Sequence, residues 1–176
     1  MKHFVGYHAT ISGKDRTPSY IPDHVLSEYH IPSFKAAIDA GAKTIMINSG
    51  IINGIPVHSS YKILTDLLRN QLGFEGVILT DWEDINKLHD RDKIVSSKKE
   101  AIRLAINAGI DMSMVPYEYE DFIDNLMELV NEGKVTMDRI DEAVSKILKL
   151  KFELDLFENP STSPSDYNDF ASEEFQ

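Results

Sequence analysis

Short apolar runs alternate with helical patterns along most of this chain. Runs with β-branched residues occupy residues 2–7, 43–48, 76–81 and 110–115, and each has the length of a strand buried on both faces. Helical patterns lie between them, so strand and helix units recur about every 30 to 40 residues. This alternation predicts an α/β fold with about four parallel strands and right-handed crossovers.

Capping and turn signals mark where the expected helices begin and end. Ser97 and Glu100 form a capping box, and Asn53 followed by Gly54 is a turn signal. Glycines that can take a left-handed helix cap follow three expected helices, at Gly41, Gly73 and Gly109. Apolar residues at helical spacing predict three helices. The first, before Gly73, carries Leu64, Leu67, Leu68 and Leu72. The two later ones carry Phe122, Ile123, Leu126 and Val130, and Ile140, Val144, Ile147 and Leu148.

Composition narrows the class of protein. The chain has 176 residues, 42% of them apolar, which suits one domain with a hydrophobic core. A formal charge of −11 argues against a nucleic-acid partner, which requires clustered cations. The sequence has no cysteine, and no apolar stretch is long enough to cross a bilayer. We therefore expect no disulfide, no membrane segment and no thiolate metal site.

The composition changes after residue 160. Ser, Pro, Asp and Glu then dominate, which is typical of a linker or tail. We therefore expect a folded domain over residues 1–160 and a linker over 161–176.

The segment GVILTDWED at 76–84 carries the clearest candidate chemistry. An apolar run ends at Asp81, which is followed by Trp82, the only tryptophan. Functional groups in α/β folds lie just beyond the carboxyl ends of such strands. Asp81 is thus either a carboxylate held at a functional site or an acidic helix cap beside a core tryptophan. The segment alone favours neither interpretation.

Six sequence blocks make a resemblance specific. They occur in the order KHFVGY at 2–7, MINS at 46–49, NGIPVH at 53–58, LTDLLR at 64–69, GFEGVILTDW at 73–82 and NAGIDM at 107–112. Together they resemble the second half of the catalytic barrel of glycoside hydrolase family 3, of the β-glucosidase type. LDLFENP at 154–160 resembles the end of that domain, and SEE at 172–174 resembles the entry to the family's second domain.

The resemblance implies retaining hydrolysis of a β-glucoside, without a metal or cofactor. Asp81 matches the family's nucleophile, which attacks the anomeric carbon while a second carboxyl group protonates the leaving oxygen. Lys2 and His3 match the pair that binds sugar hydroxyls, Trp82 would form an apolar wall, and Met46 matches a residue lining the pocket. We expect Asp81, Lys2 and Met46 to converge at the carboxyl ends of the strands.

The sequence also departs from the family. Many members have a tyrosine where this chain has Ser49, so the aromatic contact beside the nucleophile is missing or comes from elsewhere. The loop after Phe4 contains Lys14, Asp15 and Arg16 but no Asp-x-His dyad, which argues against the β-N-acetylglucosaminidase branch.

The resemblance implies a partial (β/α)8 barrel, because a full barrel has eight strands and about 250 residues. The missing barrel half and the second domain, which usually supplies the acid/base, would lie outside this chain. Inner side chains such as Ile45, Val77 and Leu79 would then be uncovered. We therefore expect the chain alone to self-associate or to be partly folded, and to bind sugars weakly.

Several residues have plainer interpretations. Trp82 and Met46 could belong to the core. The cluster at 89–92 (HDRD) has mixed charges and no standard metal spacing, so we expect a solvated loop. Asp111 is expected to make structural hydrogen bonds. The histidines without a partner pattern are expected at the surface, namely His8, His24, His30 and His58.

Two other functions share part of this pattern. A receiver domain also has an aspartate after an apolar strand, but it needs an acidic pair after its first strand, where this chain has Lys2 and His3. A carbohydrate-binding remnant that has lost catalysis would share every residue with the enzyme, so only an assay separates those two.

Overall fold

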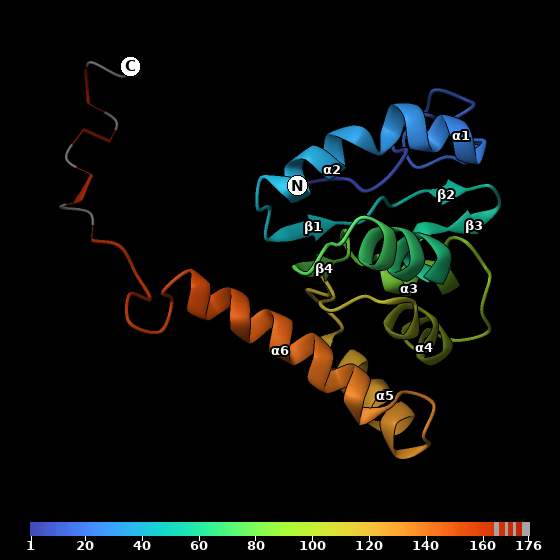
Figure 1. Cartoon of the computed structure of the whole chain (residues 1–176). Helices are drawn as coiled ribbons and strands as arrows, with labels where there is room; N and C mark the ends of the chain where they lie inside the picture. The colour runs from blue at the N-terminus through green and yellow to red at the C-terminus, as the bar shows by residue number, and fades with distance from the viewer. Residues whose placement is uncertain (164–165, 168, 171, 174–176) are drawn as a thin grey trace.

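The computed structural model describes residues 1–163, 166–167, 169–170 and 172–173 (Figure 1). The helices and short strands form one body, from which the last helix leads to the carboxyl-terminal tail. The predicted linker at 161–176 and the SEE motif lie partly outside the described residues, so both stay predictions.

Four parallel segments lie side by side in chain order. The central two are β1 (Thr44–Met46) and β4 (Val77–Leu79), which pair in parallel. Single parallel bridges join Phe4 to the residue after β1, and Met112 to the last residue of β4. The expected α/β fold with parallel strands is therefore confirmed.

The outer two segments are less regular than the sequence predicted. Residues 2–7 and 110–115 make isolated bridges and are not full strands. Each pairs with a neighbour in this chain on one side only. The Phe4 amide donates to the Met46 carbonyl at 2.9 Å, and the Asn48 amide donates to the Phe4 carbonyl at 2.7 Å. Because each segment makes a single bridge and no continuous ladder, neither forms a regular strand.

A hairpin follows β1. It consists of β2 (Ile51–Ile52) and β3 (Ile55–Pro56), which pair antiparallel. The turn residues Asn53 and Gly54 both have positive φ, 50° and 84°, as a tight hairpin requires. The turn predicted there is confirmed, and it leads into the 3₁₀ turn η2 (Val57–Ser59).

The described helices connect and flank the strands. They are α1 (Asp23–Val25), the π-helical η1 (Leu26–His30), α2 (Pro32–Asp39), the π-helical η3 (Lys62–Gln71), α3 (Asp84–Asp90), α4 (Lys98–Ala108), α5 (Tyr119–Asn131) and α6 (Met137–Glu153). One half of the predicted capping box is present, because the Ser97 hydroxyl accepts from the Glu100 amide at 3.2 Å, whereas the Glu100 carboxylate accepts from Arg103. The sequence did not predict α1, η1 or α3.

The two faces of the strands differ in burial. On one face, Ile45 and its register partner Ile78 are fully buried, and on the other face Val77 is 2% exposed, so the expectation that Ile45 and Val77 would be uncovered is wrong. Ile45 belongs to the buried core cluster, and Val77 lies beside α6, whose residues also line the space next to it. Met46 and Leu79, in register on β1 and β4, are only partly buried, and Met112 is 51% exposed. These three side chains, the Met46–Leu79–Met112 stripe, form the exposed apolar part of the sheet.

Candidate active site

Asp81 lies just beyond the carboxyl end of β4. Its side chain is 13% exposed, and Oδ1 accepts from the Trp82 amide at 2.6 Å. The Asp81 amide donates to Nε2 of His58 at 3.3 Å. Next to it, the Thr80 hydroxyl accepts from the Met114 amide at 2.8 Å. Hydrogen bonds at Asp81 itself and at the preceding Thr80 therefore fix the backbone that carries the Asp81 carboxylate.

His3 lies near this carboxylate. Burial lowers the pKa of His3, the negative charge of Asp81 opposes that shift, and the charges of Lys2 and Arg16 add to it. All of these groups must be close to the imidazole for their charges to act on it. His3 and Asp81 thus lie within electrostatic reach of each other, and the convergence of Lys2 on Asp81 stays a prediction.

A polar loop covers Asp81 from the first segment. Nη2 of Arg16 lies 3.5 Å from Oδ2 of Asp81, and the Tyr7 hydroxyl donates to the neighbouring Asp15. Arg16 has a positive φ of 59°, which turns the loop back toward the strand end. Sequence reasoning did not select Arg16. The only signal was its place in the loop after the first predicted strand.

Trp82 and Met46 lie where an apolar contact with a ligand can form. Trp82 is 45% exposed, and its ring meets that of Tyr117 edge-on at 6.0 Å, so the core interpretation of Trp82 is wrong. Met46 is partly buried on the stripe that leads toward Asp81. Both side chains therefore offer apolar surface beside the carboxylate.

Two buried polar side chains, His58 and Asp84, lie next to the backbone of Asp81. His58 is 2% exposed, so its predicted place at the surface is wrong, whereas His8 and His24 are exposed and His30 is partly buried. Nδ1 of His58 lies 3.7 Å from Oδ2 of Asp84, whose side chain is fully buried. Sequence reasoning missed both residues, because the burial of a 3₁₀ turn is decided by the helices that pack on it.

The HDRD cluster is not a solvated loop. His89 and Asp90 end α3 and bond to each other, but the Asp92 side chain is only 3% exposed and binds the Arg91 guanidinium at 2.7 Å. Nη1 of Arg91 also donates to the buried Ser49 hydroxyl at 3.2 Å. Arg91 therefore occupies the neighbourhood of the position where many family members have a tyrosine.

Asp111 has a structural role, as expected, at the opposite end of the sheet. Its carboxylate accepts from the Ile78 amide at 2.9 Å, Arg69 at 2.5 Å and Arg139 at 3.0 Å. Arg69 also donates to the Phe74 and Gly76 carbonyls, just before β4. Asp111 therefore lies near the amino end of β4.

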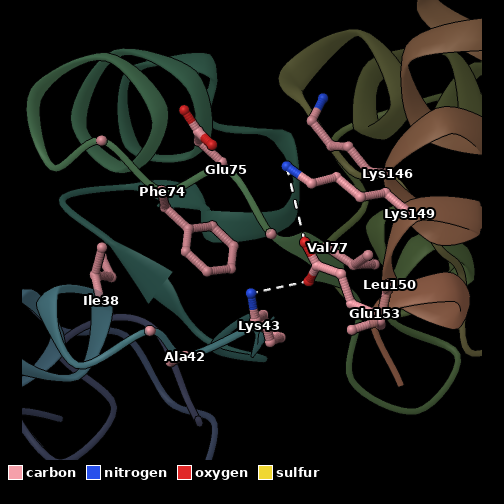
Figure 2. A pocket seen from close by; sticks show the side chains of 13 residues that line it. Ile38, Ala42, Lys43, Phe74, Glu75, Val77, Lys146, Lys149, Leu150 and Glu153 are labelled. Carbon is pink, nitrogen blue, oxygen red and sulfur yellow. Dashed lines mark ion pairs between the residues drawn. The ribbon is translucent and has the colours of Figure 1, made fainter. Parts of the chain in front are cut away.

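A cavity of about 200 Å³ opens at this amino end (Figure 2). Figure 2 shows Lys43 and Lys149 facing Glu153, with nitrogen to oxygen distances of 2.9 and 4.0 Å. The Phe74 ring and Val77 form part of the wall. Because these charges pair across the cavity and Asp81 lies at the other end of β4, the candidate site is not here.

Two absences concern the described part of the chain. Among these residues, no group of three His, Cys, Asp or Glu side chains could hold a metal ion. None of the described helices combines the length and apolar character needed to cross a membrane.

Comparisons with known proteins agree with the resemblance. The model described as "Glycosyl hydrolase family 3 N terminal domain" matches residues 1–150. The lysosomal beta glucosidase of Dictyostelium discoideum is 52% identical over 93% of this chain and 20% of its own length. The periplasmic beta-glucosidase of Salmonella typhimurium is 32% identical over 91% of this chain and 20% of its own length.

Solved structures show the same similarity. A mutant beta-glucosidase from Listeria innocua in complex with laminaribiose matches with a TM-score of 0.90 and 30% identity, over 98% of this chain and 24% of that one. The chain thus spans about a fifth of the length of the curated relatives that it matches. The match over residues 1–150 shows that this chain belongs to glycosyl hydrolase family 3.

Proposed function

We propose that this chain is the part of a retaining β-glucosidase that carries the nucleophile, Asp81. The observation that carries the proposal is a carboxylate at the end of β4, with Oδ1 bound by the Trp82 amide and Oδ2 facing Arg16. Relatives named beta-glucosidases support the activity and leave the receiver-domain alternative without support. The laminaribiose bound by the Listeria innocua enzyme supports a β-linked glucoside as substrate.

The chemistry follows from the positions of the side chains. An oxygen of Asp81 attacks the anomeric carbon, the bond to the aglycone oxygen breaks, and water later hydrolyses the glucosyl ester. Lys2 and His3 donate hydrogen bonds to sugar hydroxyls. Trp82 and Met46 contact the apolar face of the ring.

The acid/base comes from outside this chain in our proposal. Retaining enzymes hold their two carboxyl groups about 5 Å apart. Among the described residues, two carboxyl groups near Asp81 are engaged elsewhere: Asp84 is fully buried beside Lys87, and Asp15 accepts from Tyr7. A carboxyl group in these positions is not placed to protonate a leaving oxygen.

We also infer that residues 1–160 form half of an eight-stranded barrel and that 161–176 are a linker. The four parallel segments support the half-barrel, because they follow chain order and leave a partly apolar face uncovered. The much longer relatives support a partner segment that completes the barrel.

A chimera tests the proposed activity. In it, this chain replaces the matching stretch of the Dictyostelium discoideum relative, 165 residues long. The chimera should cleave an aryl β-glucoside, and Asp81→Ala should remove that turnover because no group remains to form the covalent ester. External azide should partly restore it by acting as the nucleophile.

The control and the alternative have distinct outcomes. Asp124→Ala, at an exposed position of α5, should leave turnover unchanged. Near-normal turnover of Asp81→Ala without azide would show that Asp81 is not the nucleophile. A chimera that binds glucoside without cleaving it would favour the carbohydrate-binding remnant.

A further inference from the structure

The hydrogen bond from the Asp81 amide requires one tautomer of His58. Nε2 of His58 accepts from that amide at 3.3 Å, so Nε2 carries no proton. A neutral imidazole then has its proton on Nδ1, which faces Oδ2 of Asp84 at 3.7 Å. The ring thus spans the space between the backbone of Asp81 and a buried carboxylate.

Asp84 is suited to select that tautomer. Among the described residues, neither of its carboxylate oxygens accepts a hydrogen bond, and both are buried. Its charge is offset by Nζ of Lys87 at 2.9 Å and Nη1 of Arg91 at 3.9 Å. Of the two ring nitrogens of His58, Nδ1 is the one that faces this carboxylate, so the negative charge of Asp84 stabilises the tautomer with its proton on Nδ1.

The charge state of His58 agrees with its geometry. Burial lowers its pKa to about 4, although the charges of Asp84 and Asp81 oppose the shift. The other charges that act on the ring come from Arg91 and Asp92. The imidazole is therefore neutral at pH 5 to 8 and keeps Nε2 as an acceptor.

We propose that His58, oriented by Asp84, is a positioning residue that fixes the backbone of the nucleophile Asp81. The inference rests on the proposed function. The backbone beyond Asp81 turns sharply, because Glu83 has a positive φ of 56°. On the other side, the Thr80 amide donates to the Met112 carbonyl at 3.1 Å. The amide of Asp81 itself donates to the side chain of His58, which comes from a distant part of the chain.

Two amide substitutions test the contact of His58 with Asp81 separately from its contact with Asp84. In His58→Gln, the side-chain oxygen can occupy the place of Nε2 and accept from the Asp81 amide. In His58→Asn, the shorter side chain keeps a donor near Asp84 but does not reach Asp81. We expect the Gln variant of the chimera to keep kcat within about fivefold. The Asn variant should lose about 100-fold in kcat, since a misplacement of 1 Å costs that much.

The binding and trapping readouts distinguish positioning from folding. KM for the aryl glucoside should stay nearly unchanged in both variants, because Lys2 and His3 are not moved. A 2-deoxy-2-fluoroglucoside with an activated leaving group should label Asp81 more slowly in the Asn variant. In that step the Asp81 oxygen bonds to the anomeric carbon, and the leaving group departs with its bonding electrons.

Val57→Ala supplies a matched control within the same turn. Val57 is fully buried beside His58, so its truncation should lower the unfolding temperature without reducing kcat. Equal losses of kcat in the Gln and Asn variants, or a loss of kcat in Val57→Ala as large as in His58→Asn, would overturn the positioning role. An inactive wild-type chimera, or an active Asp81→Ala, would instead contradict the proposed function on which the inference rests.

Discussion

At the scale of the residue, the burial of His58 links the fold to pH. Its folded pKa is about 4, against 6.5 when exposed, so between these values only the unfolded chain binds the proton. The contribution of neutral His58 to the free energy of unfolding is therefore complete above pH 6.5 and is lost as the pH falls toward 4. At 1.36 kcal/mol per pKa unit, the loss amounts to about 3 kcal/mol.

His58→Gln removes this titration. Between pH 7 and pH 4.5, the thermal midpoint of the chimera should fall less in His58→Gln than in the wild type. His24→Gln, at an exposed histidine, should follow the wild type. Identical pH slopes in all three proteins would contradict the buried, neutral state of His58.

Asp111 gives a second prediction at this scale. Its carboxylate is fully buried and lies between Arg69 and Arg139, whose side chains are 13% and 12% exposed. Asp111→Asn leaves the poorly solvated Arg69 guanidinium without its counter-charge and Arg139 with only Glu142 at 3.5 Å, so we expect a loss of about 3 to 5 kcal/mol. Urea unfolding measures it, with the exposed Asp124→Asn as control. A change below about 1 kcal/mol would mean that water already solvates the cluster.

At the scale of the element, the close approach of β1 and β4 depends on Gly76. A Cβ added there would clash with the Lys43 carbonyl oxygen and lie 2.7 Å from the Phe74 ring. Gly76→Ala should therefore cost about 2 to 3 kcal/mol. Gly133, with φ of 69° and open space around it, is a matched control, for which Ala should cost about 1 to 2 kcal/mol from backbone strain. Equal costs in urea unfolding would contradict the steric argument.

The elements also show what the sequence could predict. The helix α4 was found because its cap is local: Ser97 and Glu100 lie three residues apart and bond directly. The segment at 110–115 was predicted as a strand from its apolar run, but in the structure it pairs with β4 only at the bridge between Leu79 and Met112. Helix α3 follows Glu83 in a left-handed conformation, which no capping signal marks.

In the candidate site, too, residues in local motifs were predicted and residues defined by distant contacts were not. Asp81, Lys2 and His3 were found because they occur in short motifs that resemble a family. His58 and Arg91 were misjudged because their roles depend on contacts with Asp81 and Ser49, from distant parts of the chain. Burial of a polar side chain is a property of the packed structure, and no local pattern predicts it.

At the scale of the whole molecule, two of the exposed apolar surfaces of the described residues lie on the sheet and on the last helix. One is the Met46–Leu79–Met112 stripe on the sheet. The other is one side of α6, where Val144, Leu148 and Phe152 are 45%, 41% and 65% exposed. The opposite side of α6 contacts the body, where Arg139 approaches Asp111 and Glu153 pairs with Lys43, so these three apolar side chains point away from it. Contiguous apolar surface of this kind is typical of an interface with further protein.

The last prediction concerns the 176-residue chain alone. We expect it to self-associate through this apolar surface and not to cleave an aryl β-glucoside, because the proposed acid/base lies outside it. Met112→Glu should reduce association in sedimentation velocity by placing a charge on the stripe. Ile11→Glu, at a loop position that is 72% exposed, should have little effect. A monodisperse wild-type chain with a turnover of about 1 s⁻¹ or more, as typical enzymes have, would contradict both expectations.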